Sequence, residues 1–217
     1  MLAITTFPPA AWDIYAKVCL SRMVKFWPGS IRAYFEGPIP PTLEGVEFRP
    51  LDSPERQAFL DAPHEQKKGF LWAAKRFCHK VFAQLEAAKE GEPFWWIDAD
   101  VVMFKKVPEA LLEQTELVTF LGRDSYTETG LIGFNPKHPD WEWFEDRYRK
   151  MYTEEMIYRL SAWTDCHAFD TARAGRGKNL TPYGRGFENV LLESEFAPYM
   201  AHYKGPLKLD LYRLGGE

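Results

Sequence analysis

The stretch FWWIDADVVMF, residues 94–104, decides how the rest of the chain is interpreted. Large apolar side chains run without a break into Asp98, and one small residue separates it from Asp100. Such a run is typical of a buried strand, in which side chains two positions apart point to the same side. We therefore expect both carboxylates to face one way beyond the carboxyl end of a buried strand, where α/β sheets bind their ligands.

Two carboxylates held this close repel each other, and at least one pKa rises unless a cation lies between them. A divalent metal ion, which prefers hard oxygen ligands, is the natural cation. One alternative is that the acids cap a turn or pair with Lys105 and Lys106. Another is the haloacid-dehalogenase phosphatase type, but that class needs its first motif near the N-terminus and a later pair resembling G-D-x-x-x-D, and the sequence has neither.

Outward from this motif, strand-like and helix-like patterns alternate. Apolar alternation or runs predict strands at 2–7, 31–37, 46–51, 93–100, 117–122 and 130–135. Apolar side chains at helical spacing predict helices at 10–27, 70–90, 108–114, 139–155 and 161–172. This order predicts an α/β sandwich with a mostly parallel central sheet. Since no repeat or linker interrupts it, we expect residues 1–217 to form a single domain.

Composition limits the kind of protein. The chain has 217 residues and a net charge of −4, so as a whole it does not resemble a nucleic-acid-binding protein. Three unpaired cysteines favour a reducing compartment. The N-terminus lacks the pattern of a signal peptide, and no stretch has the length and apolar character of a membrane span. We therefore expect a cytoplasmic protein without membrane contact.

A second motif stands near the C-terminus. HYKGPLK places His202, Gly205 and Lys208 in an H-x-x-G-x-x-K spacing. A neutral histidine can complete a metal site begun by two carboxylates, a glycine lets the backbone approach a phosphate, and a lysine neutralises a phosphate oxygen. Alone, His202 would more often be an ordinary core or surface histidine, and it is the presence of the two aspartates that favours a ligand.

Taken together, these motifs resemble the metal-dependent, retaining GT-A-fold glycosyltransferases, including the glycogenin-like and galactosyltransferase-like groups. Three further segments match in order: FLWAAKRFCHKVFA (70–83), YTETGLIGFN (126–135) and WTDCHAFD (163–170). The resemblance covers roughly residues 1–210. It implies an α/β, GT-A-like Rossmann-type sandwich with a mostly parallel central sheet flanked by helices.

The resemblance also implies a set of ligands. Asp98 and Asp100 would bind Mn²⁺ or Mg²⁺ bridging a nucleoside diphosphate, with His202 as the third protein ligand. Lys208 and Lys204, next to Gly205, would hold the phosphates. Bridging the diphosphate screens its charge and stabilises the leaving group.

The same family places the nucleoside near the end of the first strand, at Thr5 and Thr6. Lys75 or Arg76 on the preceding helix would reach the donor, although a solvated helix face is an equally good interpretation for both.

Two further acids are candidates for catalysis. Glu128, in the segment TETG, would hydrogen-bond the acceptor hydroxyl or stabilise the oxocarbenium-like centre; its alternative is a loop acid before a glycine turn. Asp165 would hold hydroxyls of the donor sugar; its alternative is a helix-entry cap. The glycogenin-like group has D-Q-D where this chain has Asp165, Cys166 and His167, which puts the donor sugar in doubt. If stereochemistry is retained, we expect the diphosphate itself to serve as the base.

The segment 171–187 carries four cations and no acid, but it lacks the spacing of a phosphate-binding loop. It would close over the diphosphate, lie on a polyanionic acceptor, or remain a solvated loop. The TF-type first strand, the FWP helix end and the H-x-K-G-P ending are similar to compact phage-type glycosyltransferases. That likeness suggests hydroxymethylated pyrimidines in DNA as acceptors.

The sequence thus predicts a glycosyltransferase that uses a nucleoside-diphosphate sugar, with a UDP-sugar as the expected donor. Its acceptor would be hydroxymethylated DNA, contacted through 171–187, or a saccharide or other glycan. A non-catalytic nucleotide-sugar or glycan-binding module is the alternative from a different class. A nucleotidyltransferase would need a glycine-rich N-terminal loop, which LAITTFPPAAW does not provide.

Overall fold

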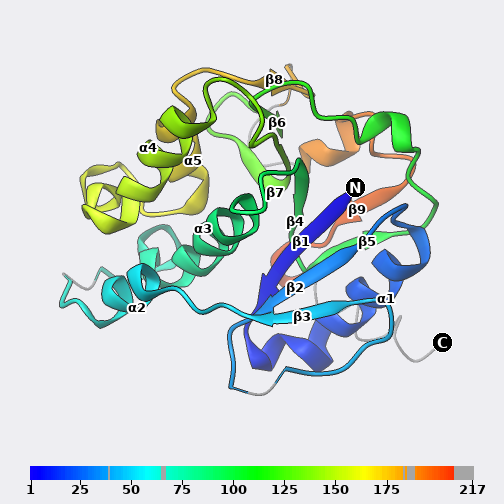
Figure 1. Ribbon diagram of the computed structural model, residues 1–217, viewed down its shortest axis with the longest axis horizontal. Helices are drawn as coiled ribbons and strands as arrows, with labels where there is room; N and C mark the ends of the chain where they lie inside the picture. The colour runs from blue at the N-terminus through cyan, green and yellow to red at the C-terminus, as the bar shows by residue number, and fades with distance from the viewer. Residues whose placement is uncertain (39, 65–66, 183, 185–188, 208–217) are drawn as a thin grey trace.

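A computed structural model describes the chain except for residues 39, 65–66, 183, 185–188 and 208–217 (Figure 1). Its main feature is a seven-stranded sheet with the strand order β3-β2-β1-β4-β7-β6-β8. The strands are β1 (Leu2–Phe7), β2 (Ile31–Phe35), β3 (Glu47–Pro50), β4 (Phe94–Ile97), β6 (Val118–Leu121), β7 (Glu128–Phe134) and β8 (Lys178–Asn179). A second, two-stranded sheet pairs β5 (Val101–Met103) with β9 (Met200–His202).

The large sheet is mostly parallel, as the sequence predicts. Strands β1, β2, β3 and β4 pair in parallel, and so do β6 and β8. Among the strands that the structure describes in this sheet, β7 alone runs the opposite way, antiparallel to both β4 and β6. Its first residue, Glu128, therefore lies beyond the carboxyl end of β4.

Helices cover the sheet on both sides (Figure 1). Helices α3, α4 and α5 lie on one side, with α2 next to α3, while α1 and the two-stranded sheet lie on the other. The α-helices are α1 (Lys17–Phe26), α2 (Pro54–Asp61), α3 (Ala74–Ala88), α4 (Trp141–Thr153) and α5 (Asp165–Arg173). A π-helix (Trp12–Ala16) precedes α1, and the 3-10 turns are Pro9–Ala11, Phe70–Trp72, Glu109–Leu111, Met156–Arg159, Val190–Glu193 and Gly205–Leu207.

Strand β4 is apolar without interruption because its side chains are buried on both faces of the sheet. Phe94 and Trp96 pack into the core beneath α3, α4 and α5, whereas Trp95 and Ile97 pack into the core on the opposite face. All four side chains are buried. Because both faces of a mostly parallel sheet are covered, a central strand such as β4 can bury apolar side chains at every position.

The structure corrects the predicted strand at 93–100. Strand β4 ends at Ile97, and residues 98–100 form a turn in which the Val101 N–H donates to the carbonyl of Asp98 at 2.9 Å. Strand alternation therefore does not orient the two carboxylates. The turn brings Asp98 and Asp100 to the same site.

Other elements also differ from the sequence-based expectation, including the short strands β5 and β8, which were not predicted. The helix predicted at 108–114 is only the 3-10 turn Glu109–Leu111. Helix α2 was not predicted, although Ser53 caps its first turn by accepting from the Arg56 N–H at 3.2 Å and Pro54 occupies its first position. Strand β9 lies in a segment where no periodic element was expected. None of the described helices has the length and apolar character needed to cross a membrane.

Candidate active site

Asp98, Asp100 and His202 converge beyond the carboxyl end of β4. Each offers a ligand atom, and these atoms lie within 4.8 Å of one another. The imidazole Nε2 of His202 is 2.9 Å from Oδ1 of Asp100 and 3.7 Å from Oδ2 of Asp98. Two carboxylates and an imidazole form a donor set that suits a divalent cation such as Mn²⁺ or Mg²⁺.

The small sheet brings the distant histidine to the aspartates. In the antiparallel pairing of β5 with β9, His202 lies opposite Val101, the residue that follows the turn. The Tyr203 N–H donates to the carbonyl of Asp100 at 3.0 Å, and the Asn189 side chain donates to the carbonyl of His202 at 2.9 Å. The backbone of the third ligand is thus fixed from both sides.

Charged groups lie close together in this site, and they shift one another's pKa values. Burial raises the pKa of Asp98, and Asp100 raises it further, while Lys80 and His202 act in the opposite direction. Burial alone would lower the pKa of His202, but its contacts with Asp100 and Glu128 outweigh burial and raise that pKa to about 9. A metal ion binds the neutral imidazole, so a metal at this site would compete with the proton that these carboxylates favour.

Lys80 connects the two sides of the site. Its ammonium lies 2.8 Å from Oδ1 of Asp98 and 2.8 Å from Oδ2 of Asp165, and donates to the Thr129 carbonyl at 2.7 Å. Only 7% of Lys80 is exposed, and although burial opposes the charged form, the two aspartates raise its pKa above the usual value. The ammonium therefore remains charged and holds both carboxylates in place.

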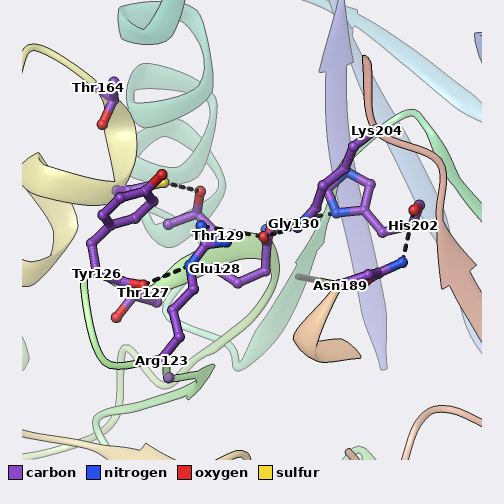
Figure 2. Close-up of polar contacts among 12 residues, drawn as sticks. Arg123, Tyr126, Thr127, Glu128, Thr129, Gly130, Thr164, Asn189, His202 and Lys204 are labelled. Atoms are coloured by element: carbon purple, nitrogen blue, oxygen red, sulfur yellow. Dashed lines mark hydrogen bonds and ion pairs between the residues drawn. The ribbon is translucent and has the colours of Figure 1, made fainter. Parts of the chain in front are cut away.

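Glu128 lies on the other side of His202, surrounded by cations (Figure 2). Its Oε1 is 3.3 Å from Nδ1 of His202, and its Oε2 pairs with Lys204 and lies 3.4 Å from Nη2 of Arg123. Burial would raise the pKa of Glu128, but His202 and Lys204 dominate and lower it well below its usual range. A carboxylate with so low a pKa is a weak base.

Asp165 is the first residue of α5, and it does not cap that helix. The cap is Thr164, whose side chain accepts from the His167 N–H. Asp165 is buried, with Oδ2 shared between Lys80 and the Thr129 hydroxyl at 2.6 Å. The helix-capping alternative from the sequence therefore does not account for this residue.

These groups line one cavity of about 610 Å³, within the usual size range of ligand pockets. Thr6 and Gly205 also line it, and the Thr6 hydroxyl donates to Glu36 at 3.0 Å. Thr5 is fully buried and does not line it.

One lysine predicted to contact the donor, Lys75, does not line this cavity. Lys75 lines a smaller cavity and donates to the carbonyls of Leu60 and Ala62, whereas Lys80, five positions further along α3, lines the large cavity. Arg76, which the sequence offered as the alternative to Lys75, does line the large cavity. Lys208 lies outside the described residues.

Part of the basic segment 171–187 is already neutralised. Arg173 pairs with Asp170 at 2.8 Å and stacks on Phe120. Arg176 lies 3.4 Å from Asp140 and stacks on Trp143. Lys178 is exposed in β8, and Arg185 is outside the described residues.

Comparison with known proteins supports the fold. No protein-family model and no curated protein sequence matches the chain. Among solved structures, the chain is similar to the bifunctional glycosyltransferase WbbM in its apo form, with a TM-score of 0.56 and 13% identity over 83% of this chain and 38% of WbbM. It is also similar to an active-site mutant of LgtC, with a TM-score of 0.51 and 12% identity over 86% of this chain and 72% of that one.

At these identities the likeness shows the fold alone, and the chain spans little more than a third of WbbM. The predicted GT-A-like α/β fold, with its mostly parallel sheet flanked by helices, is confirmed.

Three residues of the site were not found by sequence reasoning: Lys80, Arg123 and Gly130. Lys80 lies off the apolar stripe expected for its helix, which favoured a solvated position. A signal for Gly130 was present in the E-x-G spacing, because a β-carbon there would lie 2.5 Å from Cε1 and Nδ1 of His202. Only glycine lets the imidazole ring pack against β7 at this point.

Proposed function

We propose that this protein is a metal-dependent glycosyltransferase that moves a sugar from a nucleoside-diphosphate sugar to an acceptor hydroxyl. The observation that carries the proposal is the convergence of Asp98, Asp100 and His202 in a cavity of about 610 Å³. Its place on a fold similar to that of WbbM, which is named as a bifunctional glycosyltransferase, supports the same activity.

In this proposal the three converging side chains hold Mn²⁺ or Mg²⁺. A divalent cation bound there screens the charge of the donor diphosphate and stabilises it as a leaving group. Lys204 and Arg123 line the same cavity and add positive charge beside the diphosphate. Thr6, at the end of β1, contacts the nucleoside, for which uridine is the first candidate.

Asp165 is proposed to bind the donor sugar. Lys80 and Thr129 fix its Oδ2 in a buried position that lines the cavity, so the carboxylate keeps its orientation without substrate. A carboxylate fixed in this way accepts hydrogen bonds from sugar hydroxyls without first being ordered. This would orient the anomeric carbon for attack.

We propose that the reaction retains the anomeric configuration. The carboxylate of Glu128 pairs with Lys204, lies 3.4 Å from Arg123 and 3.3 Å from Nδ1 of His202, and these contacts make it unsuitable as a general base. A leaving diphosphate oxygen would then accept the proton of the acceptor hydroxyl. Determining the anomeric configuration of the product by NMR tests this directly, and an inverted product would contradict it.

For the acceptor, we propose a saccharide or other glycan ahead of hydroxymethylated DNA. The prediction of DNA came from the likeness to phage-type glycosyltransferases, with 171–187 as the expected contact. Two cations of that segment, Arg173 and Arg176, have acidic partners within the protein. The exposed aromatic ring of Phe70 lines the large cavity and offers an apolar face to either a sugar or a base. Both acceptor classes therefore belong in the first assay.

That assay combines the protein with Mn²⁺ and a panel of nucleotide sugars, and measures release of the nucleoside diphosphate together with the mass of each acceptor. Oligosaccharides and hydroxymethylated DNA serve as acceptors in parallel. Transfer that is lost with a chelator and in Asp100→Ala is the expected result. Donor turnover that persists in Asp100→Ala with chelator present would contradict the proposal.

The same assay addresses the alternative of a non-catalytic binding module. Calorimetry with each nucleotide sugar shows whether a donor binds. Binding without diphosphate release, for every donor and acceptor tested, would favour the binding module over the enzyme.

A further inference from the structure

We infer that Glu128 is a positioning residue for the metal site, which acts by holding the ring of His202 through Nδ1. This inference rests on the proposed function, because it assumes that His202 binds a metal ion. It assigns Glu128 a role different from the acceptor contact predicted from the sequence.

The two ring nitrogens of His202 face different partners. Nε2 points to the aspartates, 2.9 Å from Oδ1 of Asp100. Nδ1 lies on the opposite side of the ring, 3.3 Å from Oε1 of Glu128. A metal ion held with the aspartates therefore binds Nε2, which leaves Nδ1 to carry the proton of the neutral ring.

That proton needs an acceptor. Nδ1 is buried and has no hydrogen bond of good geometry with any described residue. The carboxylate at 3.3 Å is close enough to accept the Nδ1–H after a small adjustment, and hydrogen bonds in ligand-free sites are often longer than in the loaded state. Metal-binding histidines usually donate their second N–H to a carboxylate or carbonyl, which fixes the tautomer and the ring orientation.

Glu128 is itself firmly held (Figure 2). Its Oε1 accepts from the Gly130 N–H at 3.1 Å, and its Oε2 is paired with Lys204 and lies 3.4 Å from Arg123. Only 5% of the residue is exposed. The carboxylate thus remains charged and has little freedom to turn away from the ring.

The backbone of β7 completes the support. At Gly130 a β-carbon would lie 2.5 Å from the imidazole, so the ring packs directly against the strand that carries Glu128. Glu128 and Gly130 therefore act on the same ring, one by accepting its N–H and the other by leaving room for it. The E-x-G spacing matches this arrangement, because residues two apart in a strand share one side.

The test is the affinity for Mn²⁺, measured from the electron paramagnetic resonance signal of the free ion. Glu128→Gln is expected to raise the dissociation constant by about 10- to 100-fold. Glu36→Gln is the matched control, because Glu36 lines the same cavity but bonds Thr6 rather than His202. Its dissociation constant should stay within about twofold of wild type. A Glu128→Gln value equally close to wild type would overturn the inference.

Loss of a negative charge could weaken metal binding without any contact to the ring. Glu128→Asp keeps the charge but withdraws the carboxylate from Nδ1 by about one methylene length, ~1.5 Å. We expect it to weaken Mn²⁺ binding nearly as much as Glu128→Gln. Unchanged affinity in Glu128→Asp would show that charge alone matters and would overturn the inference. Thermal unfolding of each variant confirms that it is folded, and Glu128→Asp can be measured even if Glu128→Gln does not fold.

A double-mutant cycle with His202→Ala isolates the pair. If Glu128 acts through the ring, Glu128→Gln should change the Mn²⁺ affinity less than about twofold once His202 is absent. An effect of the same size in both backgrounds would overturn the inference.

The outcome also separates this inference from the proposed function. If metal binding depends on Glu128 but no sugar is transferred, the inference stands and the proposed glycosyltransferase activity is contradicted. If His202→Ala binds Mn²⁺ as tightly as wild type does, the histidine is not a ligand and the inference is overturned.

Discussion

Replacing Lys80 with methionine should destabilise the fold, because it removes a buried ammonium from the buried carboxylate of Asp165 and the partly buried carboxylate of Asp98. The lysine contacts Asp98 and Asp165 at 2.8 Å each, and the Thr129 carbonyl at 2.7 Å. Breaking a buried ion pair by removing one partner costs about 3–5 kcal/mol. The Asp98 side chain is 25% exposed, so water can partly replace its partner, and we expect the lower part of that range, about 3–4 kcal/mol.

For a chain of this length, that loss corresponds to a fall in Tm of roughly 6–16 °C. Urea unfolding followed by circular dichroism measures the free energy directly. The matched control is Lys137→Met, which removes an exposed pair with Glu92 and should cost less than about 1 kcal/mol.

Asp165→Asn should cost less in the Lys80→Met background than in wild type, because the carboxylate has then already lost its cation and keeps only the Thr129 hydroxyl as a partner. If Lys80→Met loses no more stability than Lys137→Met, the buried lysine does not hold the two carboxylates together and the argument is refuted.

Three further predictions follow from the geometry of the site. Asp100→Asn should weaken Mn²⁺ binding at least about tenfold, because it removes the negative charge from one of the two carboxylate ligands. An unchanged calorimetric titration would place the metal elsewhere. Gly130→Ala should both weaken Mn²⁺ binding and destabilise the fold by about 1–3 kcal/mol, because its β-carbon meets the His202 ring, and thermal unfolding checks the second effect. Burial and the nearby Arg56 lower the pKa of His79 to about 4, below its value in the unfolded chain. The contribution of the neutral imidazole to the free energy of unfolding should therefore be fully present above pH 6.5 and be lost as the pH drops towards 4. Allowing for partial exposure, the loss should be roughly 2 kcal/mol, and unfolding curves of His79→Gln should lack it.

The fold was largely predictable because its central strands consist mainly of apolar side chains. A run such as FWWI in β4 marks a strand buried on both faces, and the strand and helix alternation around it indicates a mostly parallel sheet. Strand β9 could not be found in the same way. It has three residues, and it exists because it pairs with β5, a contact about a hundred positions away in the sequence.

The site was predictable where its residues form motifs and not where packing alone creates the environment. Asp98, Asp100 and His202 stand out by type and spacing. Lys80 does not, because a lysine off the apolar stripe of a helix is usually solvated. Here α3 is covered on nearly every side, and Asp165 from α5 supplies the partner that makes burial possible.

The reversed direction of β7 had no signal in the sequence either. An apolar run such as GLIGF in β7 fits both directions equally well, because hydrogen-bond direction leaves no trace in the pattern of apolar residues. The direction matters for Glu128, since a parallel β7 would place its first residue at the opposite edge of the sheet.

Because β9 carries His202, the β5–β9 pairing makes the proposed metal site separable from the core, both in when it forms and in its stability. During synthesis, the seven-stranded sheet can be nearly complete before residue 202 is added, so the ligand set is completed late in folding. A two-stranded sheet with three residues in each strand also opens at a lower cost than the large sheet. Opening it would withdraw the histidine and leave the aspartates in place. A bound ion would oppose that opening, so metal concentration would set how often the C-terminal strand detaches from an otherwise intact protein.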